Sequence, residues 1–190
     1  MFQIRIHGRG GQGVVTAAEM LSIAAFYEGK FAQAFPSFGS ERMGAPVISY
    51  CRIDDKEIRL REPIMEPDAV IIQDPTLLGS VNVFSGLTKE SYLLFNSKQS
   101  FDQLGVADFV SQFDPKRLGM VPATELALEH IGRPLPNAAL LGSLAAVTGI
   151  IHLESVERAI REKFSGQVAE SNVTVIKAAY DFIKQNNGEG

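Results

Sequence analysis

Hydrophobic and polar positions predict how the chain begins. Residues 2–7 alternate apolar and polar side chains, which is typical of a strand with one buried face. Residues 14–28 are rich in Ala, Leu, Met and Val, and this composition predicts a helix buried over most of its circumference. Residues 31–35 have the pattern of a second strand. The chain is therefore expected to open with a Rossmann-like strand–helix–strand unit.

The central part of the chain predicts a sheet. Residues 47–53 and 57–61 are predicted to pair as a hairpin, because two strand-like runs flank three polar residues. Residues 69–73 and 92–95 are short, continuous apolar runs, which indicate central strands covered on both faces. Residues 119–121 are expected to add one more short strand.

The last third of the chain is predicted to be helical. Apolar residues at helical spacing, separated by Gly and Pro, indicate four helices, at residues 123–130, 137–151, 153–164 and 168–185. The chain has no internal repeat and no linker long enough to divide it. We therefore expect one α/β domain over residues 1–186, with a mixed sheet and helices concentrated at the C-terminal end. Residues 187–190 are expected to form a disordered tail.

Composition and charge narrow the function classes. The chain has 190 residues, and a formal net charge of -4 argues against a nucleic-acid partner. There is no signal-peptide pattern and no apolar run of membrane-spanning length, so a cytoplasmic location without membrane contact is expected. Cys51 is the only cysteine, and one thiol cannot hold an iron–sulfur cluster alone. The three histidines show no metal-ligand spacing. We therefore expect no metal site in this chain.

A glycine-rich turn is the main candidate for binding chemistry. Gly8, Gly10 and Gly13 match G-x-G-x-x-G between the first strand and the first helix. Backbone amides and the positive end of a helix dipole favour an anion there, and Arg9 adds positive charge. The glycines are equally explained by tight strand–helix packing alone. A conventional NAD site is disfavoured, because the end of the second strand is neutral and the nearest acid is Glu41.

Two polar residues near predicted strand ends have alternative interpretations. Asp74 follows a central strand, at the edge where α/β proteins place ligands, but Asp74-Pro75 is equally typical of a turn that begins a helix. His7 precedes the glycine turn, and a histidine at a strand end is more often an ordinary hydrogen-bonding residue than a ligand contact.

Seven short motifs lie in order along nearly the whole chain: residues 8–13 (GRGGQG), 34–47 (AFPSFGSERMGAPV), 52–56 (RIDDK), 66–68 (EPD), 74–78 (DPTLL), 137–142 (NAALLG) and 145–149 (AAVTG). Together they resemble the gamma subunit of pyruvate and related 2-oxoacid:ferredoxin oxidoreductases. The version at residues 42–46 (RMGAP) is closer to the pyruvate-type branch than to the 2-oxoglutarate type, where Arg-Gly-Gly is expected.

The resemblance implies a reaction carried out by several chains. Pyruvate, coenzyme A and oxidised ferredoxin would give acetyl-CoA, carbon dioxide and reduced ferredoxin, or the reverse. Thiamine diphosphate with Mg²⁺ and the [4Fe-4S] clusters would belong to partner subunits of alpha, beta and delta type. This chain would then have no catalytic or metal-ligating residue and would be inactive alone.

The resemblance and the chemistry of coenzyme A also suggest a binding role. Coenzyme A carries a 3′-phosphate and a pyrophosphate, which suit guanidinium groups and backbone amides. The candidate binding residues are Arg9, Gly10, Gly11, Gln12, Gly13 and Arg42. Alternatives remain open. The loop would instead meet a partner subunit, Arg42 would pair with Glu41 or lie in an interface, or the chain would be a pure scaffold. A stand-alone nucleotide-binding protein is the remaining alternative.

Overall fold

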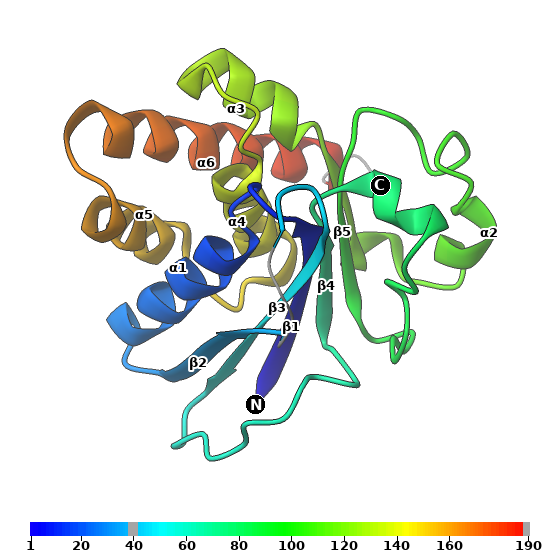
Figure 1. Cartoon of the computed structure of the whole chain (residues 1–190), viewed down its shortest axis with the longest axis horizontal. Coiled ribbons are helices and arrows are strands. Elements are labelled where there is room, and N and C mark those ends of the chain that lie inside the picture. The colour runs from blue at the N-terminus through cyan, green and yellow to red at the C-terminus, as the bar shows by residue number, and fades with distance from the viewer. Residues whose placement is uncertain (38–41, 188–190) are drawn as a thin grey trace.

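The computed structural model describes residues 1–37 and 42–187. Its centre is a mixed sheet of six strands in the order β2-β3-β1-β4-β5-β6 (Figure 1). The strands are β1 (Phe2–Arg9), β2 (Phe31–Pro36), β3 (Pro46–Asp54), β4 (Ala69–Ile72), β5 (Tyr92–Asn96) and β6 (Leu118–Val121). Strands β1, β4, β5 and β6 run parallel, whereas β3 is antiparallel to both β1 and β2. The predicted α/β domain with a mixed sheet is confirmed.

The predicted hairpin between residues 47–53 and 57–61 is wrong. Strand β3 pairs with β1 along one edge and with β2 along the other, so no edge is left for a further strand. Residues 57–61 form no strand, and Leu60 is 41% exposed. The Arg52 guanidinium instead holds the following segment, since its Nη2 donates to the Glu62 carbonyl oxygen at 2.6 Å.

Helices cover both faces of the sheet unequally. The helices are α1 (Val14–Tyr27), η1 (Pro75–Gly79), α2 (Ala107–Val110), η2 (Pro115–Arg117), α3 (Ala123–Ile131), α4 (Asn137–Thr148), α5 (Leu153–Lys163) and α6 (Gly166–Asn187). Figure 1 shows α1, α4, α5 and α6 on one side of the sheet and α2 on the other. The predicted concentration of helices at the C-terminal end is confirmed. The predicted tail is wrong at Asn187, which is the last residue of α6 and whose Nδ2 donates to Leu118 O at 3.3 Å, and residues 188–190 lie outside the described residues.

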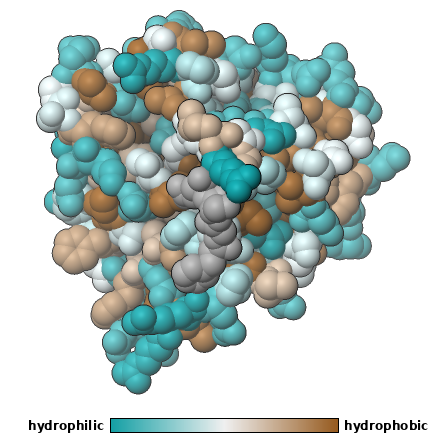
Figure 2. All heavy atoms as spheres, in the orientation of Figure 1, coloured by the Kyte–Doolittle hydropathy of each residue, from teal (hydrophilic) through white to brown (hydrophobic). Residues whose placement is uncertain are grey.

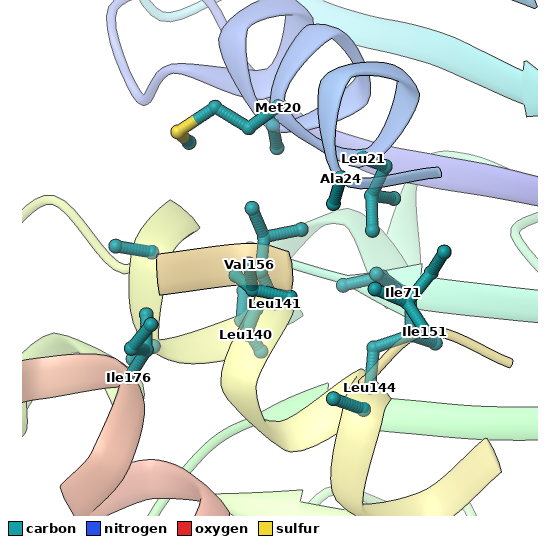
Figure 3. Close-up of a cluster of buried hydrophobic side chains, with 14 of the residues drawn as sticks. Met20, Leu21, Ala24, Ile71, Leu140, Leu141, Leu144, Ile151, Val156 and Ile176 are labelled. Atoms are coloured by element: carbon teal, nitrogen blue, oxygen red, sulfur yellow. The ribbon is translucent and has the colours of Figure 1, made fainter. Parts of the chain in front are cut away.

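The main hydrophobic core lies between the sheet and the larger helical layer. Met20 and Leu21 of α1 belong to the same buried cluster as Leu140 and Leu141 of α4 (Figure 3). Helix α4 is buried along nearly its whole length, which explains why its sequence is apolar all round. It ends at Thr148, before the predicted residue 151, because Gly149 has φ 63° and closes the helix in the left-handed region.

Two further contacts fix the helices that support the site. A Cβ on Gly142 of α4 would lie within 3.0 Å of the Ile176 backbone, so glycine lets α4 and α6 approach closely. After α1, the Glu28 carboxylate accepts the His152 N–H at 2.7 Å, at the start of α5. Partial burial alone raises the pKa of Glu28, but hydrogen bonds from His152, Ser155 and Lys30 leave this pKa below its ordinary value. The carboxylate is therefore stabilised in its charged form and joins α1 to α5.

The last two features of the fold are the hydrophobicity of its helices and of its surface. None of the helices in residues 1–37 and 42–187 is both long and apolar enough to cross a bilayer. On the face drawn in Figure 2, hydrophobic residues lie scattered among hydrophilic ones.

Candidate functional site

The candidate site lies where the carboxyl ends of β1 and β4 meet. These strands are parallel neighbours. The chain leaves β1 toward α1, which packs on one face of the sheet, and leaves β4 toward η1, which packs on the other. Such a divergence creates a crevice at the sheet edge, the usual ligand position in open α/β sheets. The glycine turn is at this crevice.

Close packing accounts for glycine at two positions of the turn. A Cβ on Gly10 would overlap the Arg42 carbonyl oxygen. Gly13 precedes α1 with φ 72° and caps it without a side chain, and a Cβ there would lie within 3.0 Å of Asn137 Nδ2. Asn137 itself is buried and donates to the Gly13 carbonyl oxygen at 3.4 Å. Packing therefore explains the glycines structurally without deciding whether the turn binds a ligand.

The backbone amides of the turn divide into two groups. The Gly10 N–H donates to Ala45 O at 2.9 Å, and the Gln12 N–H donates to Arg9 O at 3.1 Å. The amides of Gly11 and Gly13 have no acceptor among the described residues, and neither do the three amides of the first turn of α1. The residues with unbonded amides, Gly11, Gly13, Val14, Val15 and Thr16, line a hollow of about 170 Å³ together with Arg9, Gly10 and Val47. The first turn of α1 contains no acidic residue. The hollow is thus suited to a negatively charged group.

Arg9 is held by residues that are distant in sequence. Its Nε lies 3.2 Å from Asp74 Oδ2. Nε and Nη2 both donate to Thr76 Oγ1, at 3.1 and 2.8 Å, and Nη1 donates to Gly44 O at 3.0 Å. A guanidinium has five N–H groups. One N–H on Nη1 and one on Nη2 are left without an acceptor among the described residues.

Asp74 connects three segments at the crevice. Its Oδ1 accepts the Thr76 N–H at 3.0 Å and so caps η1. Its Oδ2 accepts from Gln12 Nε2 at 2.8 Å and forms an ion pair with Arg9, whose Nε lies 3.2 Å away. Burial alone raises the pKa of Asp74, but hydrogen bonds from Thr76 and Gln12 and the Arg9 charge lower it below the ordinary value. Asp74 is therefore an anion at neutral pH. Both interpretations of Asp74 apply, as a helix start and as a residue of the crevice.

The loop before β3 lies against the glycine turn. Met43 forms an isolated bridge with Gly10, and the Gly44 N–H donates to Gly10 O at 3.0 Å. The Met43 side chain is 86% exposed and covers Gly11, where a Cβ would meet its Sδ at 2.7 Å. Arg42 directly precedes this bridge and is exposed. The structure therefore brings Arg42 beside the turn, while the alternative partner Glu41 lies outside the described residues.

The buried environments of His7 and Cys51 do not suit a catalytic or metal-binding role. His7 is buried, and its Nε2 accepts from Arg5 Nε at 2.9 Å. Burial, and then the Arg5 charge, lower the pKa of His7 to about 3, so this imidazole is neutral and structural. Burial raises the pKa of Cys51 to about 12. A buried neutral thiol within a strand does not fit a cluster ligand. Among the described residues, no group of three or more His, Cys, Asp or Glu is arranged to hold a metal ion.

Comparison with known proteins gives the family. The family model described as pyruvate ferredoxin/flavodoxin oxidoreductase matches residues 3–182. The chain belongs to this family. Within it, the chain is 47% identical over 181 residues to the pyruvate/ketoisovalerate oxidoreductases common subunit gamma of Pyrococcus furiosus, covering 95% of this chain and 96% of that protein. It is 47% identical over 188 residues to pyruvate synthase subunit PorC of Methanocaldococcus jannaschii, covering 99% and 100%.

A solved structure of the family confirms the fold. The crystal structure of pyruvate oxidoreductase subunit PORC from Thermotoga maritima matches with a TM-score of 0.80 and 36% identity, covering 95% of each chain. The resemblance to gamma subunits of the pyruvate-type oxidoreductases is thus confirmed by sequence and by fold.

Sequence reasoning found the turn but missed most of its partners. Thr76 and Gly44 were not singled out, and Asp74 was not assigned to Arg9. The available signal for Asp74 was its position directly after a central strand. Only the placement of β4 next to β1 shows that this position faces Arg9.

Proposed function

We propose that this chain is a non-autonomous gamma subunit of an oxidoreductase that converts pyruvate, coenzyme A and oxidised ferredoxin to acetyl-CoA, carbon dioxide and reduced ferredoxin. Its family membership and the names of its relatives support this role. The Pyrococcus furiosus relative is named as common to pyruvate and ketoisovalerate oxidoreductases. A gamma subunit shared by two enzymes leaves the choice of 2-oxoacid to other chains, and we extend this division to the present protein.

Partner subunits of alpha, beta and delta type supply the redox cofactors in this proposal. Thiamine diphosphate with Mg²⁺ and [4Fe-4S] clusters provide decarboxylation and electron transfer to ferredoxin. The single thiol of this chain is buried, and its raised pKa opposes the thiolate form that a cluster requires. The chain is therefore expected to be inactive alone.

The glycine turn contributes to coenzyme A binding in this proposal. The observation that carries it is the hollow at the start of α1, bordered by Arg9 and by amides without acceptors among the described residues. A phosphate there would accept from Gly11, Gly13 and the remaining N–H groups of Arg9. Gly10 and Gln12 use their amides to shape the turn instead. Arg42, exposed beside the turn, would meet a second phosphate.

The test is the double variant Arg9→Ala/Arg42→Ala in the assembled complex. The Michaelis constant for coenzyme A should rise about tenfold or more, because even one charge-assisted hydrogen bond is worth roughly 1.5–3 kcal/mol. Arg59→Ala is the matched control, since Arg59 is an exposed arginine that forms an ion pair with its neighbour Glu57. An unchanged Michaelis constant in an intact complex would support a scaffold role instead. Binding of NAD or FAD by the purified chain would revive the stand-alone alternative.

A further inference from the structure

Two Asp-Pro turns of this chain have the same local structure and different surroundings. Asp74 and Asp114 each precede a proline, and each side chain accepts the N–H two residues later to start a 3₁₀ helix. For Asp114 this bond, to the Lys116 N–H at 2.9 Å, is exposed at the surface. Capping alone therefore does not require the further contacts that Asp74 makes.

The two carboxylate oxygens of Asp74 have separate partners. Oδ1 accepts from Thr76 N and Thr76 Oγ1, at 3.0 and 2.6 Å. Oδ2 accepts from Gln12 Nε2 and faces Arg9 Nε, so it contacts both ends of the glycine turn. The Asp74 side chain is only 12% exposed, and its bond from Gln12 is partly buried, whereas its bonds from Thr76 lie at the surface.

Asp74 and Thr76 occupy one edge of the Arg9 guanidinium, while Nη1 donates one N–H to Gly44 O at 3.0 Å. Nε and Nη2, which lie on the same edge, are directed at Asp74 and Thr76. Asp74 also fixes Thr76, because it accepts from both the backbone and the hydroxyl of that residue. The N–H groups left over belong to the terminal nitrogens Nη1 and Nη2. A guanidinium held along one edge presents the other in a fixed direction, the geometry that suits a phosphate.

We propose that Asp74 is a positioning residue that orients Arg9, and through it the glycine turn, toward the phosphates of coenzyme A. The inference rests on the proposed function of the turn and adds Asp74 as the residue that orients Arg9. Asp74 touches no ligand in this account. It acts by holding Arg9 and Gln12 in the arrangement that the hollow requires.

The decisive variant is Asp74→Asn in the assembled complex. Asparagine keeps an oxygen for the cap of η1 but places an NH₂ group where Oδ2 faces the donors of Arg9 and Gln12. The Michaelis constant for coenzyme A should rise about tenfold, the equivalent of one charge-assisted hydrogen bond, with the effect on this constant rather than on kcat at saturating coenzyme A. Asp114→Asn is the control for the same change at an Asp-Pro cap that has no contact with the glycine turn, and it should leave the constant unchanged.

A double-mutant cycle tests whether Asp74 acts through Arg9. Once Arg9→Ala is present, Asp74→Asn should cause little further increase, because the residue to be positioned is gone. In the purified chain, the Arg9 Nε–H should exchange slowly with water in the wild type and in Asp114→Asn. It should exchange fast in Asp74→Asn. This NMR measurement reports orientation without any catalytic step.

The outcomes separate this inference from the function on which it rests. A raised Michaelis constant in Arg9→Ala, together with Asp74→Asn behaving like Asp114→Asn, would overturn the positioning role and leave the coenzyme A contact standing. A lowered constant in Asp74→Asn would also overturn it, because Asp74 would then compete with the ligand for Arg9. An unchanged constant in Arg9→Ala would remove the coenzyme A contact and the positioning role together.

Discussion

Replacing Gly13 by alanine tests how tightly the glycine turn is built into the fold. Gly13 has φ 72°, and an L-residue in the left-handed region costs roughly 1–2 kcal/mol. Its new Cβ would also displace the Asn137 side chain, which is buried and donates to Gly13 O at 3.4 Å. Losing that bond adds about 1 kcal/mol.

The free energy of unfolding should therefore fall by about 2–3 kcal/mol in Gly13→Ala. For a chain of this length, Tm should fall by roughly 4–12 °C in differential scanning calorimetry. Gly29→Ala is the matched control, because Gly29 has φ 71° and no atom within 4 Å of an added Cβ. It should show the backbone cost alone.

The energetic cost of the contact between the new Cβ and Asn137 can be measured separately in the Asn137→Ala variant. In Asn137→Ala chains the obstructing side chain is gone, so Gly13→Ala should cost no more than Gly29→Ala does in the wild type. Equal destabilisation by Gly13→Ala and Gly29→Ala in the wild type would refute the reasoning, since it would show that Asn137 yields without cost.

Two further variants and one labelling experiment test other parts of the structure. Glu28→Gln should lower the free energy of unfolding by about 1 kcal/mol at neutral pH, because Gln keeps an oxygen for the His152 N–H but loses the charge that Lys30 faces, and Glu57→Gln is its exposed control. Because the folded pKa of Glu28 is lowered, its contribution is complete above the unfolded pKa of about 4.3 and is lost as the pH falls through the folded value. Urea titrations should therefore show a smaller deficit of the variant at pH 3 than at pH 7. Gly142→Ala should cost about 2–3 kcal/mol in urea unfolding, because the α6 backbone must move, whereas Gly79→Ala, with open space around it, should cost far less; equal costs would contradict this. Cys51 should resist Ellman's reagent at pH 8 until the chain unfolds, and rapid labelling of the native chain would contradict its burial.

Local patterns predicted most elements because hydrophobic periodicity reflects which side chains are buried. The helix at residues 14–28 and the strands at 69–73 and 92–95 were visible for this reason. The error at 57–61 has a physical cause. Those residues have a strand-like pattern, but pairing needs a free edge, and β1 and β2 occupy both edges of β3. A local sequence pattern does not show which strand edges are already paired.

The site was predictable in part for the same reason. The turn around Gly10 is local, so its position between strand and helix followed from the pattern. The ion pair between Arg9 and Asp74 joins residues 65 positions apart and depends on β4 lying beside β1. The sequence also could not predict which amides of the turn are hydrogen-bonded within the fold. The acceptor Ala45 O comes from a loop whose path the sequence does not specify.

The most direct test of the central claim is to tag this chain in its native host, purify it without oxygen and identify what accompanies it. We expect co-purifying alpha, beta and delta-type subunits, bound iron and thiamine, and coenzyme A-dependent reduction of a dye by pyruvate. A lone, cofactor-free chain, from a preparation shown to preserve intact complexes, would contradict it.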